Sequence, residues 1–224
     1  MRTADHMNLS RYIMDHMDAG ASKLQKAAFI FGSIEPDINM LTYFRGSSRG
    51  EEKLRGHNYE NVMKYMEKLI KKLEKGGMGT VRQSFLIGKL VHYVADSFTY
   101  PHNSIFPGNL REHCQYETEL HSYVNHMISS DNVNLDSIDD GIDIVEYLEE
   151  MHDRYVSEAL GCENDYRHIT HAISVVTERL WQTESVSMPS MRDVAIACKE
   201  HIPVTANASM AAAGKTGMES TGVA

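Results

Sequence analysis

Cysteine is scarce in this sequence, and so are the segments that mark membrane-spanning or exported chains. Three widely spaced cysteines and no CxxC pair occur in 224 residues. That usage argues against a disulfide scaffold and favours free thiols in a reducing compartment. No apolar run approaches the roughly 18 residues that cross a bilayer, and the start, MRTADHMNLSRYIM, lacks the apolar stretch of a signal peptide. We therefore expect a cytoplasmic protein, or one exported by an unusual route.

Positive charge is also in short supply. The chain has 22 Lys and Arg against 31 Asp and Glu, a net charge of −9. A protein that binds nucleic acid through a broad basic face is expected to have an excess of positive charge. The negative net charge therefore argues weakly against nucleic acid as a partner. A small metal site could still attract one phosphate locally. Histidine, in contrast, is abundant, with 12 copies, and it is the main functional hint in the composition.

Sustained period-two alternation is absent, so no strands are predicted. Apolar residues instead recur at helical spacing, as Val62, Met66, Leu69 and Leu73 do. Helices are predicted at about 7–19, 22–31, from Asn58 or Asn61 to the Gly76-Gly77 pair, 79–99, 109–129, 138–160, 163–184 and 190–200. The fold class is all-α, a single-domain multi-helix bundle over residues 1–204. The small-residue tail, 205–224, is expected to be disordered.

Histidines and carboxylates gather in HYVADSFTYPHN and HCQYETELH. His92 and Asp96 are four residues apart, so they share one face of a helix, and His113 and Glu117 repeat that spacing. Between the two pairs lies His102, where the chain must turn after a proline. Helices joined by a short connection usually lie antiparallel, so the two faces can converge in the core. Imidazoles and carboxylates are natural zinc ligands, and burying them without a cation is costly. The segment therefore predicts a metal site.

Two weaker patterns compete with this interpretation. A single His–carboxylate pair at this spacing is more often a surface contact, but two pairs with a third histidine among apolar neighbours favour a metal site. The adjacent pair His152-Asp153 resembles the HD dipeptide of metal-dependent phosphohydrolases, although an isolated dipeptide is weak evidence. His168 and His171 have no acidic partner at a matching spacing, so they are interpreted as surface or core residues.

The segments GKLVHYVADSFTYPHN and HCQYETELH resemble the bacterial zinc-dependent phospholipase C family. That family shares its helical fold and three-zinc site with the fungal single-strand-specific zinc nucleases. The common pattern is His-x3-Asp, a histidine about six residues later, and then His-x3-Glu or Asp. Upstream, FGSIEPDI offers Asp37, RGHNYEN offers His57 and DHMNLSRYIMDHM offers His6. The resemblance thus spans roughly residues 1–125.

The resemblance implies two or three zinc ions. One would be held by Asp37, His57, His92 and Asp96. A second would be held by His102, His113 and Glu117. A third would share Asp96 and take His6. In the family, the third zinc also binds the amino end of an N-terminal tryptophan, whereas here Trp181 is the only tryptophan. We expect the amine of Met1 to take that place, because a free amine with a pKa near 8 can lose its proton when a metal binds.

The activity implied by the resemblance is zinc-dependent hydrolysis of a phosphodiester by a metal-activated hydroxide. Asp37 would be a ligand and a candidate proton acceptor, and Glu117 a ligand only. The sequence Tyr100-Pro101-His102-Asn103 is closer to the phospholipase side, so the expected substrate is a phospholipid or small phosphodiester. Two alternatives stay open, since their ligands look alike: a single-strand nuclease or phosphatase on the same scaffold, and a non-catalytic zinc-binding helical module.

Overall fold

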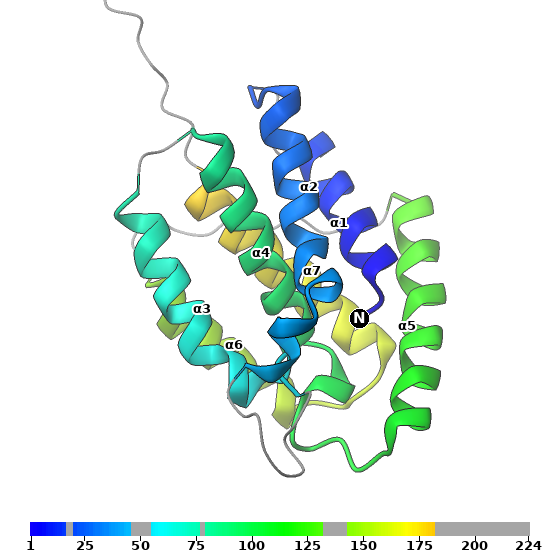
Figure 1. Cartoon of the computed structure of the whole chain (residues 1–224). Helices are drawn as coiled ribbons and strands as arrows, with labels where there is room; N and C mark the ends of the chain where they lie inside the picture. The colour runs from blue at the N-terminus through cyan, green and yellow to red at the C-terminus, as the bar shows by residue number, and fades with distance from the viewer. Residues whose placement is uncertain (17–19, 46–54, 77–78, 132–142, 182–224) are drawn as a thin grey trace, which may run out of the picture. The chain divides into compact units, whose positions relative to one another are not determined.

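A computed structural model describes residues 1–16, 20–45, 55–76, 79–131 and 143–181, and Figure 1 shows their arrangement. Within these ranges the chain is helical and contains no strand, which confirms the all-α prediction. The α-helices are α1 (Thr3–His16), α2 (Lys23–Ile38), α3 (Tyr59–Glu74), α4 (Val81–Ser97), α5 (Leu110–Ser129), α6 (Ile144–Ser157) and α7 (Cys162–Leu180). Two short 3-10 helices are η1 (Met40–Phe44) and η3 (Tyr100–His102). The predicted helix at 190–200 and the tail at 205–224 lie outside the described residues.

Local capping explains where several helices begin. Ser22 and Gln25 form a reciprocal capping box at the start of α2, and Asn109 and Glu112 form another at α5. The side chain of Thr80 caps α4. Two predicted boundaries are wrong. α1 begins at Thr3 rather than near residue 7, and α2 runs on to Ile38 rather than ending at 31.

α4 lies at the centre of the bundle, in contact with α2, α3 and α7 (Figure 1). Most of its residues are buried, including a polar face that carries His92 and Asp96. Other apolar residues from every α-helix pack into one continuous core with it. Because His92 and Asp96 lie on the buried part of α4, their polar groups must find partners inside the protein.

α2 and α4 cross with their backbones in contact. A Cβ atom added at Gly32 would lie 2.1 Å from the carbonyl oxygen of Phe85, and one added at Gly88 would lie 2.0 Å from that of Phe29. No side chain fits at either position, so the two glycines set the distance between the helices. This contact brings the C-terminal end of α2, where Asp37 lies, beside the face of α4 that carries His92 and Asp96.

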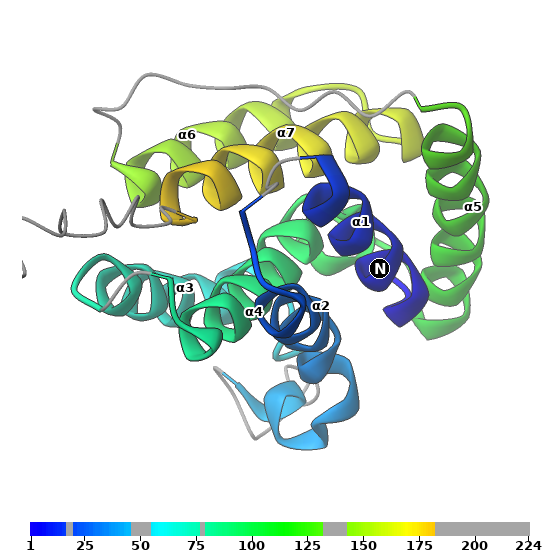
Figure 2. The ribbon, with the colours of Figure 1, turned by 90° about the horizontal axis from the view of Figure 1, so that it is seen from above.

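α1 is joined to α5 by a series of polar contacts, which we call the α1–α5 seam. Both views place the two helices side by side, as Figure 2 shows from above. The paired side chains are Arg2 with Thr118, Asp5 with His121, Asn8 with Asn125 and Tyr12 with Asp131. Their spacing along α1, three or four residues, follows one face of the helix. The seam therefore fixes the N-terminal end of the chain against the helix that carries His113 and Glu117.

Candidate metal centre

All the groups predicted to bind metal converge in one region of the bundle. The Met1 amine and His6 come from the start of the chain, Asp37 from the end of α2, His57 from the loop before α3, His92 and Asp96 from α4, His102 from η3, and His113 and Glu117 from α5. Segments far apart in sequence thus meet at the end of α4. Their role as ligands remains a prediction, but the convergence is a property of the fold.

Three clusters of ligand atoms are present, and within each the atoms lie within 4.8 Å of one another. The clusters are His6–His92–Asp96, Asp37–His57–His92 and His102–His113–Glu117. One cluster contains the three residues predicted for the second zinc, and another places His6 beside Asp96; their binding of metal stays a prediction. His92 belongs to two clusters, so the first and third sites adjoin.

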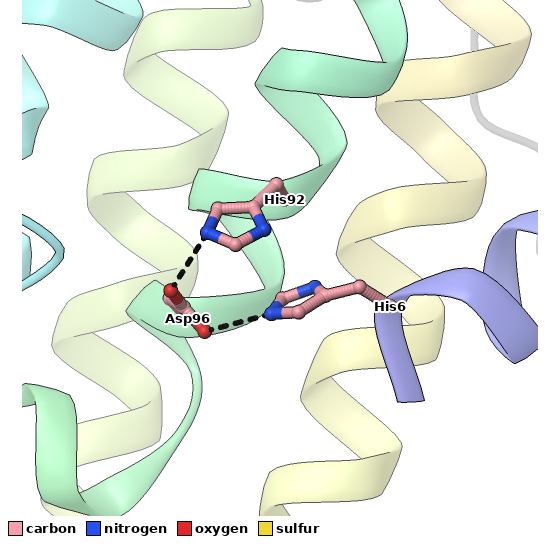
Figure 3. Close-up of side chains that lie close together, drawn as sticks. All are labelled: His6, His92 and Asp96. Atoms are coloured by element: carbon pink, nitrogen blue, oxygen red, sulfur yellow. Dashed lines mark ion pairs between the residues drawn. The ribbon is translucent and has the colours of Figure 1, made fainter. Parts of the chain in front are cut away.

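Asp96 lies between the clusters with its two oxygens facing different neighbours. Figure 3 shows one oxygen directed toward His92 and the other toward His6. Oδ2 lies 3.2 Å from Nε2 of His92 and 3.1 Å from Nδ1 of His57. Oδ1 lies 3.2 Å from Nε2 of His6 and 3.0 Å from the amino nitrogen of Met1. A carboxylate placed in this way can bridge two metal ions.

Hydrogen bonds outside the clusters fix which nitrogen of each imidazole is free. Nδ1 of His92 lies 2.9 Å from the main-chain carbonyl of Ser33, which can only accept, so Nδ1 carries the proton and Nε2 keeps its lone pair. Nε2 of His57 lies 3.0 Å from the hydroxyl of Thr42, and that hydroxyl donates to the carbonyl of Pro36 at 2.6 Å. His57 therefore donates from Nε2, which leaves its Nδ1 free. Such supporting contacts are typical of metal-bound histidines.

The two free nitrogens point at each other. Nε2 of His92 lies 3.2 Å from Nδ1 of His57, and both lie close to Oδ2 of Asp96. Lone pairs that face one another at this distance repel unless a proton or a cation lies between them. Oδ2 of Asp37 is also buried without a hydrogen-bond partner, which is costly in a protein interior. The donor set therefore fits zinc, for which neutral imidazoles and carboxylates are preferred ligands.

The Met1 ammonium is a buried cation among these carboxylates. Its nitrogen lies 2.9 Å from Oε1 of Glu117 and 3.1 Å from Nε2 of His102, in addition to its contact with Asp96. Burial alone lowers the pKa of the amine, but Asp96 and Glu117 outweigh that effect and raise the pKa to about 11. The protonated amine thus neutralises part of the charge that a metal would otherwise neutralise.

Electrostatics favour the metal-binding form at Asp96, Glu117, His102 and His6. At His92, burial alone lowers the pKa, but Asp96 outweighs that effect and raises the pKa above its usual value. Burial alone would raise the pKa of Asp96 and Glu117, yet the Met1 ammonium and nearby imidazoles hold both pKa values well below the usual range. Burial lowers the pKa of His102 to about 4 and also lowers that of His6. At neutral pH the carboxylates are therefore ionised and these two imidazoles are neutral.

A cavity of about 640 Å³ opens onto part of the centre. Five of the candidate ligands line it together with Met1: Asp37, His57, His102, His113 and Glu117. His6, His92 and Asp96 do not line it and are almost completely buried. Hence a substrate in the cavity can approach the Asp37–His57 side and the His102–Glu117 side, while the His6 cluster lies behind them.

The competing HD pattern finds no support in the geometry. The ring of His152 stacks on Tyr59 with centroids 3.4 Å apart, and its Nε2 contacts Oδ1 of Asn103 at 2.7 Å. It joins none of the possible metal clusters among the described residues. His168 is buried and pairs with Glu158 at 3.0 Å across the α6–α7 connection. Glu158 is therefore an acidic partner of His168, although the two residues are not three or four positions apart on one helix.

Sequence reasoning missed the groups that support the ligands. The carbonyl of Ser33 has no sequence signature because every residue has a carbonyl. Thr42 acts through the η1 turn, whose position depends on where α2 ends. His121 ends the segment HCQYETELH, one helical turn after Glu117, but its pairing with Asp5 in the α1–α5 seam has no signature in the sequence.

Comparison with known proteins gives one finding. A family model described as zinc-dependent phospholipase C matches residues 5–162, about 70% of the chain. The matched range includes every candidate ligand except Met1. The comparisons with curated proteins and with solved structures returned no match. None of the described helices has the length and apolar character needed to span a membrane.

Proposed function

The chain belongs to the zinc-dependent phospholipase C family, and on that premise we propose that it is a zinc-dependent phosphodiester hydrolase acting on a phospholipid or a small phosphodiester. One observation carries the proposal. Asp96 lies between clusters of free imidazole nitrogens, with one oxygen toward His57 and His92 and the other toward His6. Two closely spaced metal ions are the usual means of clamping a phosphoryl group during an in-line displacement.

We assign the ligands as the sequence predicts, with two or three zinc ions per chain. Asp37, His57, His92 and Asp96 would hold the first. His102, His113 and Glu117 would hold the second. His6, Asp96 and the Met1 amine would hold the third. Zinc, when bound, supplies a Lewis acid that activates water and polarises the phosphoryl group.

Asp37 is the residue we propose as proton acceptor. Its side chain is 12% exposed, it lines the cavity, and its Oδ2 has no hydrogen-bond partner. Its Oδ1 lies 3.6 Å from Nε2 of His92 and 3.7 Å from Nδ1 of His57. One oxygen could therefore bind metal while the other is left to accept a proton. Glu117 is already surrounded by Met1, His102 and His113, so coordination is its only role.

The deciding experiment measures metal content and turnover on the same untagged protein. We expect two or three zinc ions per chain by plasma mass spectrometry, and hydrolysis of a phospholipid or a p-nitrophenyl phosphodiester. Asp96→Asn should lose at least one zinc and reduce kcat/KM by about 100-fold or more, because the bridging charge is removed. His16→Gln is a matched control, since His16 lies outside the three clusters and is largely exposed.

Other outcomes select other functions. Turnover of short single-stranded DNA or a phosphomonoester without turnover of the lipid would assign the site to a nuclease or phosphatase. Stoichiometric zinc with no turnover of any ester would leave a structural zinc-binding module. Absence of zinc after zinc has been supplied would overturn the proposal.

A further inference from the structure

Two arginines line the cavity in addition to the candidate ligands. Arg2 and Arg55 both contribute to its wall. The guanidinium of Arg2 donates to the hydroxyl of Thr118, the residue after Glu117. Arg55 is exposed and precedes His57 by two residues. The two positive charges are thus associated with different sides of the centre, one with the His102–Glu117 side and one with the Asp37–His57 side.

Neither guanidinium is neutralised by a carboxylate within the part of the chain that the structure describes. Other arginines do have partners: Arg167 pairs with Glu158, and Arg45 lies over the ring of Tyr65. The only carboxylates among the residues that line the cavity are Asp37 and Glu117, and both are committed to the metal centre. Among the described residues that line it, the cavity therefore has two arginines without a carboxylate partner and no carboxylate outside the candidate metal centre.

The charges that line the cavity bear on which alcohol portion of a phosphodiester it can bind. A quaternary ammonium headgroup needs a carboxylate or an open aromatic face. Tyr43 has one face stacked on His57, with centroids 4.4 Å apart, and Phe106 packs at right angles to Tyr100. Two unpaired arginines, in contrast, can bind a phosphate or a carboxylate with geometric specificity.

We propose that the cavity selects phosphodiesters whose alcohol portion carries a second anionic group, such as a phosphate or carboxylate, through Arg2 and Arg55. This inference rests on the proposed function for the identity of the reacting group, which the metal centre would hold. The arginines would bind the second anion and orient the ester. A zwitterionic choline ester would lack that contact and would meet repulsion from both guanidinium groups.

Binding can be measured without turnover. Isothermal titration calorimetry on zinc-loaded protein would compare three phosphonates: methylphosphonate, 3-phosphonopropionate and the trimethylammonioethyl phosphonate. We expect 3-phosphonopropionate to bind about tenfold more tightly than methylphosphonate, and the ammonium compound more weakly than either, because each exposed guanidinium–carboxylate contact contributes a few-fold in affinity. The Arg2→Gln/Arg55→Gln double variant should reduce the tenfold preference to about twofold or less.

Controls separate charge from folding. Arg55→Lys should keep most of the preference, and Arg82→Gln, an exposed arginine outside the cavity, should keep all of it. Circular dichroism would verify that the double variant is folded. An equal preference in the wild type and a folded double variant would overturn the inference, as would tighter binding of the ammonium compound.

Failure of the proposed function would look different. If 3-phosphonopropionate is preferred in the arginine-dependent way but no ester is hydrolysed, the anion selectivity stands and the hydrolase assignment fails. If esters are hydrolysed but the preference does not depend on the arginines, the hydrolase assignment stands and the selectivity fails. Turnover of p-nitrophenyl diesters bearing propyl, carboxypropyl or choline groups would extend the comparison to kcat/KM.

Discussion

Asp165 is a buried carboxyl group without a cationic partner among the described residues. Its Oδ2 accepts from the main-chain N–H of Tyr100 and the hydroxyl of Tyr116, and its Oδ1 accepts from the hydroxyl of Tyr155. The contact with Tyr100 holds η3, the turn that carries His102. Burial raises the pKa of Asp165 from 3.8 to about 6, since the three hydrogen bonds only partly offset the loss of water.

That shift predicts a specific pH dependence. The unfolded chain releases the proton of Asp165 first as pH rises, so the stability it contributes is complete below about pH 4 and is lost by about pH 6. Relative to Asp165→Asn, the wild-type free energy of unfolding should fall by roughly 2 kcal/mol between about pH 4.5 and about pH 7. Urea denaturation of both proteins across this range measures it. Parallel pH profiles would contradict the prediction.

The Met1 amine gives a second prediction at the scale of one residue. Residues added in front of Met1 would convert the buried amine into an amide, which has no charge and no free lone pair. We expect an extended protein to bind about one zinc fewer and to be less stable, because Asp96 and Glu117 lose a buried counter-ion. Zinc content and thermal unfolding, before and after proteolytic removal of the extension, provide the measurement and its control. Unchanged zinc content would rule out the amine as a ligand.

At the scale of the helix, contacts between residues close together in the sequence could be predicted, and contacts between residues far apart in the sequence could not. The spacing of His92 and Asp96, and of His113 and Glu117, is fixed by the helical turn, so both pairs could be placed on one face in advance. The end of α2 could not be placed. Its apolar run stops before Gly32, a residue that commonly follows a helix. Here Gly32 instead allows contact with α4, a long-range role that no local pattern reveals.

The α2–α4 contact predicts the effect of a single methyl group. Gly88→Ala would place a Cβ atom against the carbonyl oxygen of Phe29 and force the helices apart. We expect a loss of about 1–3 kcal/mol in stability, typical of overpacking, and weaker zinc binding, because His92 would move away from the carbonyl of Ser33. Gly76→Ala at the end of α3 is the control, since its added methyl would come no closer than 3.2 Å to another atom. Equal stability of the two variants would contradict this interpretation of the crossing.

At the scale of the molecule, the core and the metal centre are one structure. The all-α class followed from the helix pattern, and the grouping of His102 with His113 and Glu117 followed from the family resemblance. The approach of α1 to α5 did not, because it depends on side-chain pairs such as Asp5 with His121 that share no sequence spacing. Long-range polar contacts of this kind are visible only once the helices are packed.

Because the candidate ligands lie on the helices that form the core, we expect a bound metal to stabilise the whole fold. Zinc at about 100 times its dissociation constant should raise the free energy of unfolding by roughly 3 kcal/mol, provided that the unfolded chain does not bind it. Chelation should lower the melting temperature correspondingly without unfolding the protein at room temperature, since the Met1 ammonium still balances Asp96 and Glu117. Differential scanning calorimetry with zinc and with chelator tests both statements. A chelated protein that melts at the same temperature would contradict them.

If zinc takes the Met1 amine as a ligand, as proposed above, metal uptake is also an exchange reaction. A zinc ion that takes the amine as a ligand must expel its proton to the solvent, and that proton is captured by whatever buffer is present. The heat of zinc binding should therefore depend on the ionisation enthalpy of the buffer, and a plot of one against the other should have a slope close to the number of protons released. If the amine is a ligand, zinc affinity should therefore rise with pH, because the proton on the amine competes with the metal for the same lone pair.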